Sequence, residues 1–482
     1  MAFRIALLLS FMTLITQGCH DNPSKNSKGH YLTHFEVSQG EQTPTYAQVI
    51  AYYHKLAEDF TTISIYQMGQ TDSGEPLHLV VYKGKGTKNI VNDSLGDLPF
   101  VLINNGIHPG ESDGIDASMM LMRDLAQGNL ATPNNISIGV IPIYNIGGAL
   151  NRNSGTRTNQ NGPKEYGFRG NAQNFDLNRD FIKSDTKNAI AFAEIFHTVK
   201  PFWFVDTHVS NGADYQYTLT HLFTQHNKLG GPLGDYVHQS LMPDLENMLA
   251  AQDWPITPYV NVFNQSPEFG FNQFIDHPRY STGYTTLFHT AGMMIETHML
   301  KPYKQRVMAT YALLTDFITL ADQQVDVVAQ LRQETTSRFR PGQRYAMDWT
   351  LDTTAHTTRS FLGFEAAKKP SALTGFDRLF FDRNKPYNRE IAYQDTYRSK
   401  KEVVIPHSYI IPKTYDKVIT LLKANDIQMT QWPKSQTIDA EVYYIDDYKT
   451  SKNPFEGHYL HSGTKVRSQN QSNTIQQGDW VV

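Results

Sequence analysis

The strongest constraint on the fold is a strand, loop and helix pattern that begins at Phe100. Residues 100–103 are apolar and favour β structure, an Asn-Asn-Gly sequence breaks the run, and residues 115–125 have the spacing of a helix. A further helical pattern precedes a second apolar run at residues 201–205. Strands that alternate with helices are typical of α/β proteins, which bind ligands where the strands end. The sequence therefore predicts an α/β domain with a site at one edge of its sheet.

Imidazole and carboxylate side chains follow three of the predicted strands. His108 and Glu111 lie three residues apart after the first strand, His208 follows the second, and Glu296 follows the apolar run 292–295. A lone His-x-x-Glu pair is expected by chance in a chain with 18 histidines, but here the other two strand ends supply a third ligand and a base. Two histidines and one carboxylate form a catalytic zinc site that leaves one position for water. Glu296 is then the expected general base, because a carboxylate buried at a strand end is otherwise costly.

The loop-like region 151–179 supplies positive charge beside these strand ends. Arg169 is expected to stabilise a developing oxyanion. Asn178 and Arg179 are expected to hold a carboxylate through a charge-assisted fork. Asp176 is placed to orient a ligating histidine.

Together these motifs resemble the zinc metallocarboxypeptidases of the carboxypeptidase A/E type. The motifs are His108-Pro-Gly-Glu111, the stretch from Arg169 to Phe181, Asp206-Thr-His208 and Glu296-Thr-His298. The resemblance covers residues 44–320, and its most diagnostic part is the stretch 169–181. It implies a three-layer α/β/α fold around a mixed sheet and removal of the C-terminal residue of a peptide.

The resemblance also implies a role for each residue. One Zn²⁺ per chain would be bound by His108, Glu111 and His208. Glu296 would be the general base, Arg169 the oxyanion arginine, Asn178 and Arg179 the clamp on the substrate carboxylate, and Asp176 the hydrogen-bond partner of His108.

The substrate-capping tyrosine and the side-chain pocket are less well defined. Tyr280 and Tyr284 both precede Glu296, at a spacing shorter than in the pancreatic enzymes, and Tyr280 is the preferred candidate. The loops that would line the pocket cannot be aligned, so a basic, aliphatic or aromatic preference stays open.

The N-terminus has the pattern of an export signal. Residues 5–15 are apolar but too few to span a membrane, and Cys19 is the single cysteine of the chain. Gly18-Cys19 resembles a lipobox but departs from it at the two preceding residues. We expect a signal peptide at 1–18 and an exported protein: a periplasmic or outer-membrane lipoprotein anchored at Cys19, or a secreted protein. With one cysteine, no disulfide is expected in the mature chain.

The composition argues against nucleic-acid binding. The 482 residues are 19% charged with a formal net charge of −4, which gives no basic patch for nucleic acid. We expect a tether at 19–44, a catalytic domain at 45–325, and a smaller β-rich C-terminal domain of unknown role at 326–482. A monomer is expected.

Three functions remain open from the sequence. The first is hydrolysis of C-terminal peptide bonds, with peptide or protein C-termini as substrates. The second keeps the zinc hydrolase but changes the substrate to cell-wall or γ-linked peptides. The third is an inactive peptide- or glycan-binding protein, which the intact ligands and Glu296 argue against.

Overall fold

The computed structural model describes residues 31–84 and 98–482. The predicted signal peptide and Cys19 lie outside these residues. From Thr33 to Val482 the chain forms one compact unit, which is described below. Within the described residues, no helix has the length and apolar character needed to cross a membrane.

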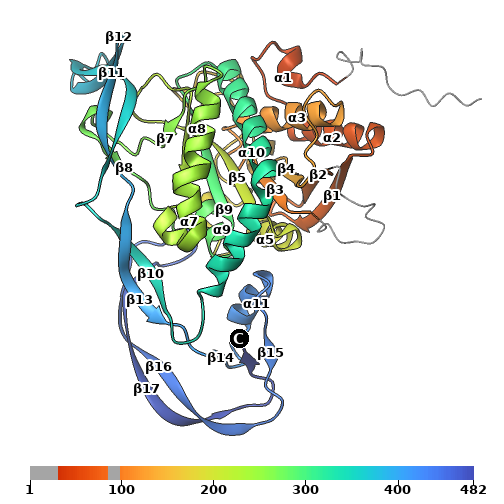
Figure 1. Cartoon of the computed structure of the whole chain (residues 1–482), viewed down its shortest axis with the longest axis vertical. Coiled ribbons are helices and arrows are strands. Elements are labelled where there is room, and N and C mark those ends of the chain that lie inside the picture. Colours follow the sequence, from red (N-terminus) through yellow and green to blue (C-terminus); the bar gives the residue numbers. More distant parts are fainter. Residues whose placement is uncertain (1–30, 85–97) are drawn as a thin grey trace, which may run out of the picture. The chain divides into compact units, whose positions relative to one another are not determined.

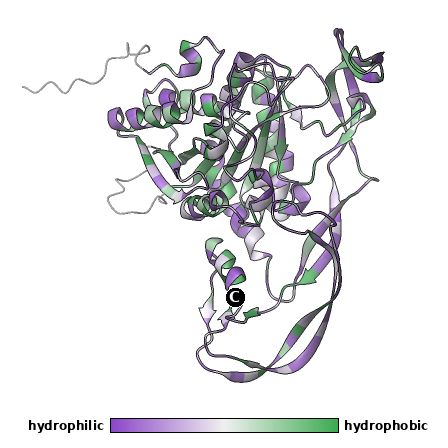
Figure 2. Ribbon diagram, turned by 180° about the vertical axis from the view of Figure 1, so that it is seen from behind, coloured by the Kyte–Doolittle hydropathy of each residue, from purple (hydrophilic) through white to green (hydrophobic). Residues whose placement is uncertain are grey.

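A mixed sheet of eight strands forms the centre of the N-terminal part, in the order β1-β2-β4-β3-β5-β9-β6-β7 (Figure 1). The strands are β1 (Ile63–Gln70), β2 (Pro76–Tyr82), β3 (Phe100–Asn104), β4 (Ser137–Ile141), β5 (Trp203–Ser210), β6 (Leu219–Phe223), β7 (Thr257–Pro258) and β9 (Ala291–His298). The four central strands, β4, β3, β5 and β9, are parallel. They are buried on both faces and mostly hydrophobic, as parallel strands require (Figure 2).

Helices cover both faces of this sheet. The longer ones are α2 (Tyr46–Asp59), α3 (Asp113–Ala126), α5 (Lys187–Val199), α8 (Met242–Ala250) and α10 (Tyr303–Ser337). The shorter ones are α1 (His34–Val37), α4 (Ile146–Leu150), α6 (His226–Leu229), α7 (Gly231–Tyr236) and α9 (Ser281–Thr286). Helices α3 and α10 pack together against one face, and α5 and α9 pack against the other. The predicted three-layer α/β/α fold is confirmed.

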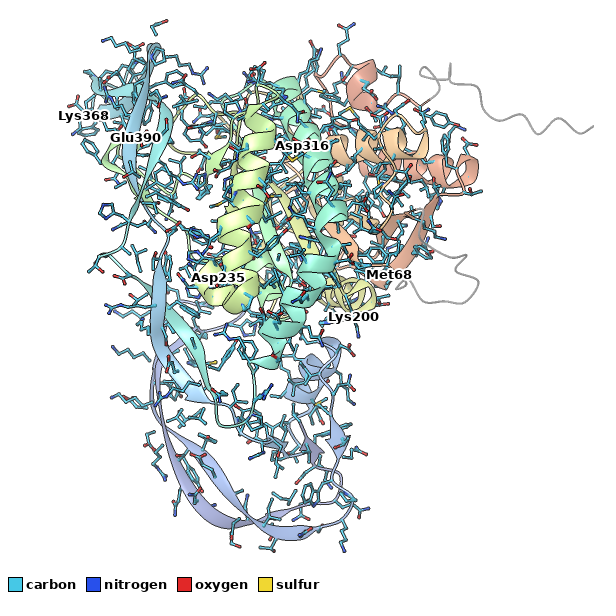
Figure 3. The ribbon with its side chains drawn as sticks, in the orientation of Figure 1. Met68, Lys200, Asp235, Asp316, Lys368 and Glu390 are labelled. Carbon is cyan, nitrogen blue, oxygen red and sulfur yellow. The ribbon has the colours of Figure 1, made fainter. Side chains whose placement is uncertain are left out.

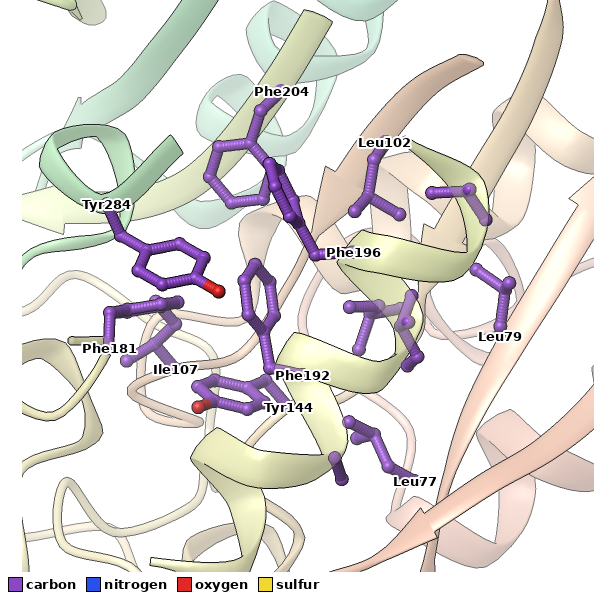
Figure 4. Packing of buried hydrophobic residues seen from close by; sticks show 14 of the residues in the cluster. Leu77, Leu79, Leu102, Ile107, Tyr144, Phe181, Phe192, Phe196, Phe204 and Tyr284 are labelled. Carbon is purple, nitrogen blue, oxygen red and sulfur yellow. The ribbon is translucent and has the colours of Figure 1, made fainter. Parts of the chain in front are cut away.

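The core under α5 is built from aromatic side chains. Phe192 and Phe196 of α5 pack with Phe204 of β5, Tyr144 and Tyr284 (Figure 4). Each buried ring contributes about 1.5–3 kcal/mol by leaving water. Because this cluster fixes α5 against the sheet, it also fixes the loop before α5, which carries residues of the site.

Local sequence sets the two ends of α5. The side chain of Thr186 accepts a hydrogen bond from the backbone N–H of Ala189 and caps the helix. Lys200, labelled in Figure 3, adopts a left-handed conformation with φ of 44° and ends it. The chain then turns directly into β5.

The folded region begins earlier than the sequence predicted. Thr33 and Glu36 form a capping box that starts α1, and Phe35 is buried against the ring of Tyr303. The prediction of a tether that extends to residue 44 is therefore wrong for residues 33–44.

The C-terminal part is rich in β structure, as the sequence predicted, but it begins later in the chain than the predicted boundary. Its strands are β10 (Arg344–Leu351), β11 (Thr357–Pro370), β12 (Asp377–Gln394), β13 (Tyr397–Val404), β14 (Ile410–Ile411), β15 (Thr430–Gln431), β16 (Gln436–Thr450), β17 (His461–Ile475) and β18 (Trp480–Val481), with one helix, α11 (Asp416–Ala424). Helix α10 continues through position 325 to Ser337, so the predicted boundary falls inside a helix. The β-rich part begins at Arg344.

The C-terminal part is also packed against the N-terminal part. Strand β12 pairs in parallel with β8 (Phe271–Asn272), which precedes β9 in the chain. Phe361 and Tyr393 of the C-terminal part share one buried cluster with Tyr215 and Phe271. The two parts therefore have a common hydrophobic core.

Candidate functional site

The sheet brings the predicted site residues to one edge. Strands β3 and β5 are parallel neighbours, with Asn104 beside Asp206 in the register. Strands β5 and β9 are also parallel neighbours, with His208 beside Glu296. His108 follows β3, whereas His208 and Glu296 lie near the carboxyl ends of β5 and β9. Parallel strands bring their carboxyl ends to one edge of the sheet, which is the physical basis of the sequence prediction.

Three of these residues form a compact set of ligand atoms. His108, Glu111 and His208 are buried, and one nitrogen or oxygen atom of each lies within 4.8 Å of the others. The Nδ1 atom of His108 lies 3.2 Å from Oε1 of Glu111, and Nδ1 of His208 lies 3.1 Å from Oε2. Both imidazoles thus direct the same ring atom toward one carboxylate.

The opposite nitrogen of each ring is held by a second carboxylate. Nε2 of His108 lies 3.0 Å from Oδ1 of Asp176, and Nε2 of His208 lies 3.0 Å from Oδ2 of Asp206. An Nε2–H donated to a carboxylate leaves the Nδ1 lone pair free to bind a metal. Two imidazoles and a carboxylate arranged in this way fit the donor set of catalytic zinc.

Electrostatics favour a cation at this place. Burial would raise the pKa of Glu111, but His108 and Arg157 hold the pKa of Glu111 well below its usual value. Burial would likewise raise the pKa of Asp176, which its contacts with His108 and Arg169 hold low. Burial opposes a proton on His208, whereas Asp206 and Glu111 raise the pKa of His208 well above its usual value. A divalent cation would displace that proton, so binding of the cation is expected to weaken in acid.

Glu296 lies beside this set and is not part of it. It lines the same cavity as the three ligands. Burial, aided by the negative charge of Glu111, raises the pKa of the Glu296 carboxyl to about 8. A divalent cation nearby would favour its ionised form, which is the form that can accept a proton.

Two arginines of the predicted set line the cavity. Nη2 and Nε of Arg169 donate to Oδ2 of Asp176 at 2.8 and 3.2 Å, and its Nη1 lies 3.3 Å from Nδ1 of His108. Nη1 of Arg179 donates to the backbone oxygen of Asn178 at 2.7 Å. Asn178 lines the cavity as well.

The two tyrosines have different environments. Tyr280 lines the cavity, with the Arg179 guanidinium 4.7 Å from the centre of its ring. Tyr284 is fully buried in the core under α5, and its hydroxyl donates to Oδ1 of Asn425 at 2.7 Å. The prediction that Tyr284 binds substrate is therefore wrong. Tyr280 precedes α9 with extended backbone, whereas Tyr284 is on the helix and faces the core.

Arg157 lines the cavity and was not among the predicted site residues. Its Nη1 donates to Oε1 of Glu111 at 2.8 Å, and its Nη2 donates to the backbone oxygen of Val209 at 3.1 Å. No spacing or motif distinguishes it from the other arginines of its loop, so it could not be predicted as a site residue.

The cavity has a volume of about 430 Å³. Part of its wall is apolar or aromatic, including Leu222, Phe263, Phe274 and Met294. Among the described residues that line it, the only carboxylates are Glu111 and Glu296. The cavity can therefore accept an apolar group beside an anion.

A protein-family model matches part of the chain. Residues 49–207 match the family described as zinc carboxypeptidase. The match includes His108, Glu111 and the stretch 169–179, and it ends one residue before His208. No curated protein matches the chain.

Several solved structures resemble the chain at low identity. A metallo-carboxypeptidase from Burkholderia cenocepacia is 15% identical over 57% of this chain and 68% of its own, with a TM-score of 0.42. Carboxypeptidase A from Helicoverpa armigera is 14% identical over 62% of this chain and 75% of its own, with a TM-score of 0.44. A metallo-carboxypeptidase from Pseudomonas aeruginosa, in complex with (2-guanidinoethylmercapto)succinic acid, is 13% identical over 58% and 68%, with a TM-score of 0.40. Likenesses this distant carry no argument about substrate.

Proposed function

We propose that the chain is a zinc-dependent enzyme that hydrolyses the C-terminal bond of peptides, because residues 49–207 match the family described as zinc carboxypeptidase. One observation carries the proposal. The two imidazole Nδ1 atoms and the Glu111 carboxylate converge beside the partly buried carboxylate of Glu296, in a cavity that also contains Arg179. This set combines metal ligands, a base and an anion-binding group.

His108, Glu111 and His208 would hold the zinc ion, and Asp176 and Asp206 would keep both imidazoles in the ligating tautomer. When bound, zinc supplies Lewis acidity, which makes water more acidic and a carbonyl more electrophilic. Side chains of the protein carry out the remaining steps.

Glu296 takes the proton from the attacking water and gives it to the leaving amine. Arg169 donates to the oxygen on which negative charge develops. Asn178 and Arg179 bind the C-terminal carboxylate of the substrate, and Tyr280 packs against the Arg179 guanidinium. The apolar part of the cavity wall favours an apolar or aromatic C-terminal side chain, since it lacks a spare carboxylate for a basic one.

Paired peptides test this function. A peptide with an aromatic C-terminal residue and a free carboxylate should lose that residue, as detected by mass spectrometry, whereas its C-terminal amide should stay intact. A metal chelator should stop the reaction, and added zinc should restore it. Cleavage of the amide at the same rate, or activity that resists chelation, would disprove the proposal. Muropeptides and γ-linked peptides tested in parallel would show whether they are the better substrates.

The N-terminal pattern adds a proposal about location. We infer export through residues 1–18, with the mature protein anchored in a membrane by lipid on Cys19 and otherwise monomeric. Metabolic labelling with a radioactive fatty acid should mark the wild type and not Cys19→Ala. Equal labelling of both proteins would exclude this anchor.

A further inference from the structure

The tip of the C-terminal hairpin contacts the segment that carries the site. Strands β16 and β17, dark blue in Figure 1, are joined by residues 451–460. Phe455 and His458 exchange two backbone hydrogen bonds, of 2.8 and 3.0 Å, and enclose a two-residue turn. Oε1 of Glu456 accepts from the backbone N–H of Asp176 at 2.7 Å. Residues 280 positions apart in the sequence are thus hydrogen-bonded.

Two further contacts anchor the same turn. Oε2 of Glu456 accepts from Nζ of Lys183 at 3.2 Å. Nε2 of His458 lies 2.7 Å from Oδ2 of Asp185. The side chain of Glu456 is only 9% exposed, and a buried carboxylate of this kind needs the hydrogen bond and the cation that it has here.

The backbone of Glu456 supports a specific role for its side chain. The turn has positive φ at both central residues, 48° at Glu456 and 82° at Gly457. Turns of this type favour Asn, Asp or Gly at the first central position, because other side chains are strained there. A glutamate in this position is unfavourable for the turn itself, so its contact with Asp176 accounts for its presence better than the turn does.

Asp176 connects the turn to the chemistry. Its carboxylate holds Nε2 of His108 at 3.0 Å and the guanidinium of Arg169 at 2.8 Å. The same carboxylate accepts from the backbone N–H of Asn178 at 3.0 Å. A shift of the Asp176 backbone would therefore move a proposed metal ligand, the oxyanion arginine and the carboxylate clamp together.

We propose that Glu456 is a positioning residue for the active site, through which the C-terminal hairpin fixes Asp176 and hence His108, Arg169 and Asn178. This inference rests on the proposed function for its kinetic consequences. Its consequence for metal binding is independent of any substrate. The β-rich C-terminal part thereby acquires a role in the site, although it contributes no side chain to the cavity lining among the described residues.

In the test, Glu456 is replaced by residues that favour the conformation of the turn but whose side chains are too short to accept the hydrogen bond from the Asp176 N–H. Asn and Gly both favour positive φ, so Glu456→Asn and Glu456→Gly should keep the hairpin folded. Both should weaken zinc binding about tenfold in a chelator competition, as expected when support of a ligating histidine is lost. Both should also raise KM and lower kcat, because the clamp and Arg169 move with Asp176.

Two matched variants complete the design. Glu456→Gln keeps an oxygen that accepts from the Asp176 N–H and should restore most of the zinc affinity. Glu441→Gln, on β16 with its side chain bonded to Tyr443 of the same strand, should behave as wild type. Unchanged zinc affinity in both Glu456→Asn and Glu456→Gly would overturn the inference. If the wild type proves unable to cleave peptides, the proposed function fails, while the zinc comparison still decides the role of Glu456.

Discussion

Glu296→Gln is expected to lower kcat by about 10²–10⁴-fold, the usual contribution of a positioned general base. Glutamine has nearly the same shape as glutamate but cannot accept the proton of the attacking water. Because Glu296 lies outside the His108, Glu111 and His208 ligand set, the variant should still bind zinc as the wild type does.

The environment of Glu296 is the reason for so large an effect. Burial and the charge of Glu111 raise the pKa of the carboxyl to about 8. Such a carboxylate is a stronger base than one in water, and zinc beside it would return its pKa toward neutrality. Steady-state kinetics with a metal analysis of the same sample would check the prediction. Glu334→Gln, on the exposed face of α10, is the control. A Glu296→Gln enzyme with activity within tenfold of wild type would remove Glu296 from the mechanism.

Arg179→Ala is expected to reduce kcat/KM for free-acid peptides by about 30–100-fold. Loss of one partner from a buried charge pair costs about 2–5 kcal/mol, and each 1.4 kcal/mol is about tenfold. Arg179 is partly exposed, which places the expected effect toward the lower end of that range. The loss should appear mainly in KM, because the carboxylate is bound before and during the reaction.

The C-terminal amide separates this role from a structural one. Wild type should prefer the free acid strongly, and Arg179→Ala should lose most of that preference while it retains zinc. Arg179→Lys keeps the charge without the planar fork and should fall between the two. Arg340→Ala, at an arginine outside the cavity lining, is the matched control. An Arg179→Ala enzyme that still prefers the free acid would show that another group binds the carboxylate.

The sequence predicted that the site lies at one edge of the sheet, because neighbouring parallel strands have their carboxyl ends at the same edge. His108, His208 and Glu296 each follow an apolar run, and parallel neighbours must end at one edge. The rule does not determine the register that places His208 beside Glu296, which only the structure shows. The alternation of strands and helices predicted an α/β domain, and the three layers were implied by the resemblance to the zinc metallocarboxypeptidases.

Features that depend on contacts distant in sequence were not predictable. Tyr280 and Tyr284 have similar surroundings in the sequence. Only the packing of α9 determines that Tyr280 lines the cavity whereas Tyr284 lies in the core. Helix α10 crosses residue 325 because its apolar residues continue to pack beyond the position where the composition changes. Neither Arg157 nor Glu456 belongs to a motif, and their partners lie 46 and 280 residues away.

Zinc content is the most direct test of the account. Wild-type protein, purified without added metal and then loaded with zinc and desalted, should contain one zinc ion per chain by elemental analysis. His208→Ala should retain far less under the same treatment, and Glu296→Gln should retain as much as wild type. Equal zinc in wild type and His208→Ala, or none in wild type, would contradict a metal centre built from the ends of three strands.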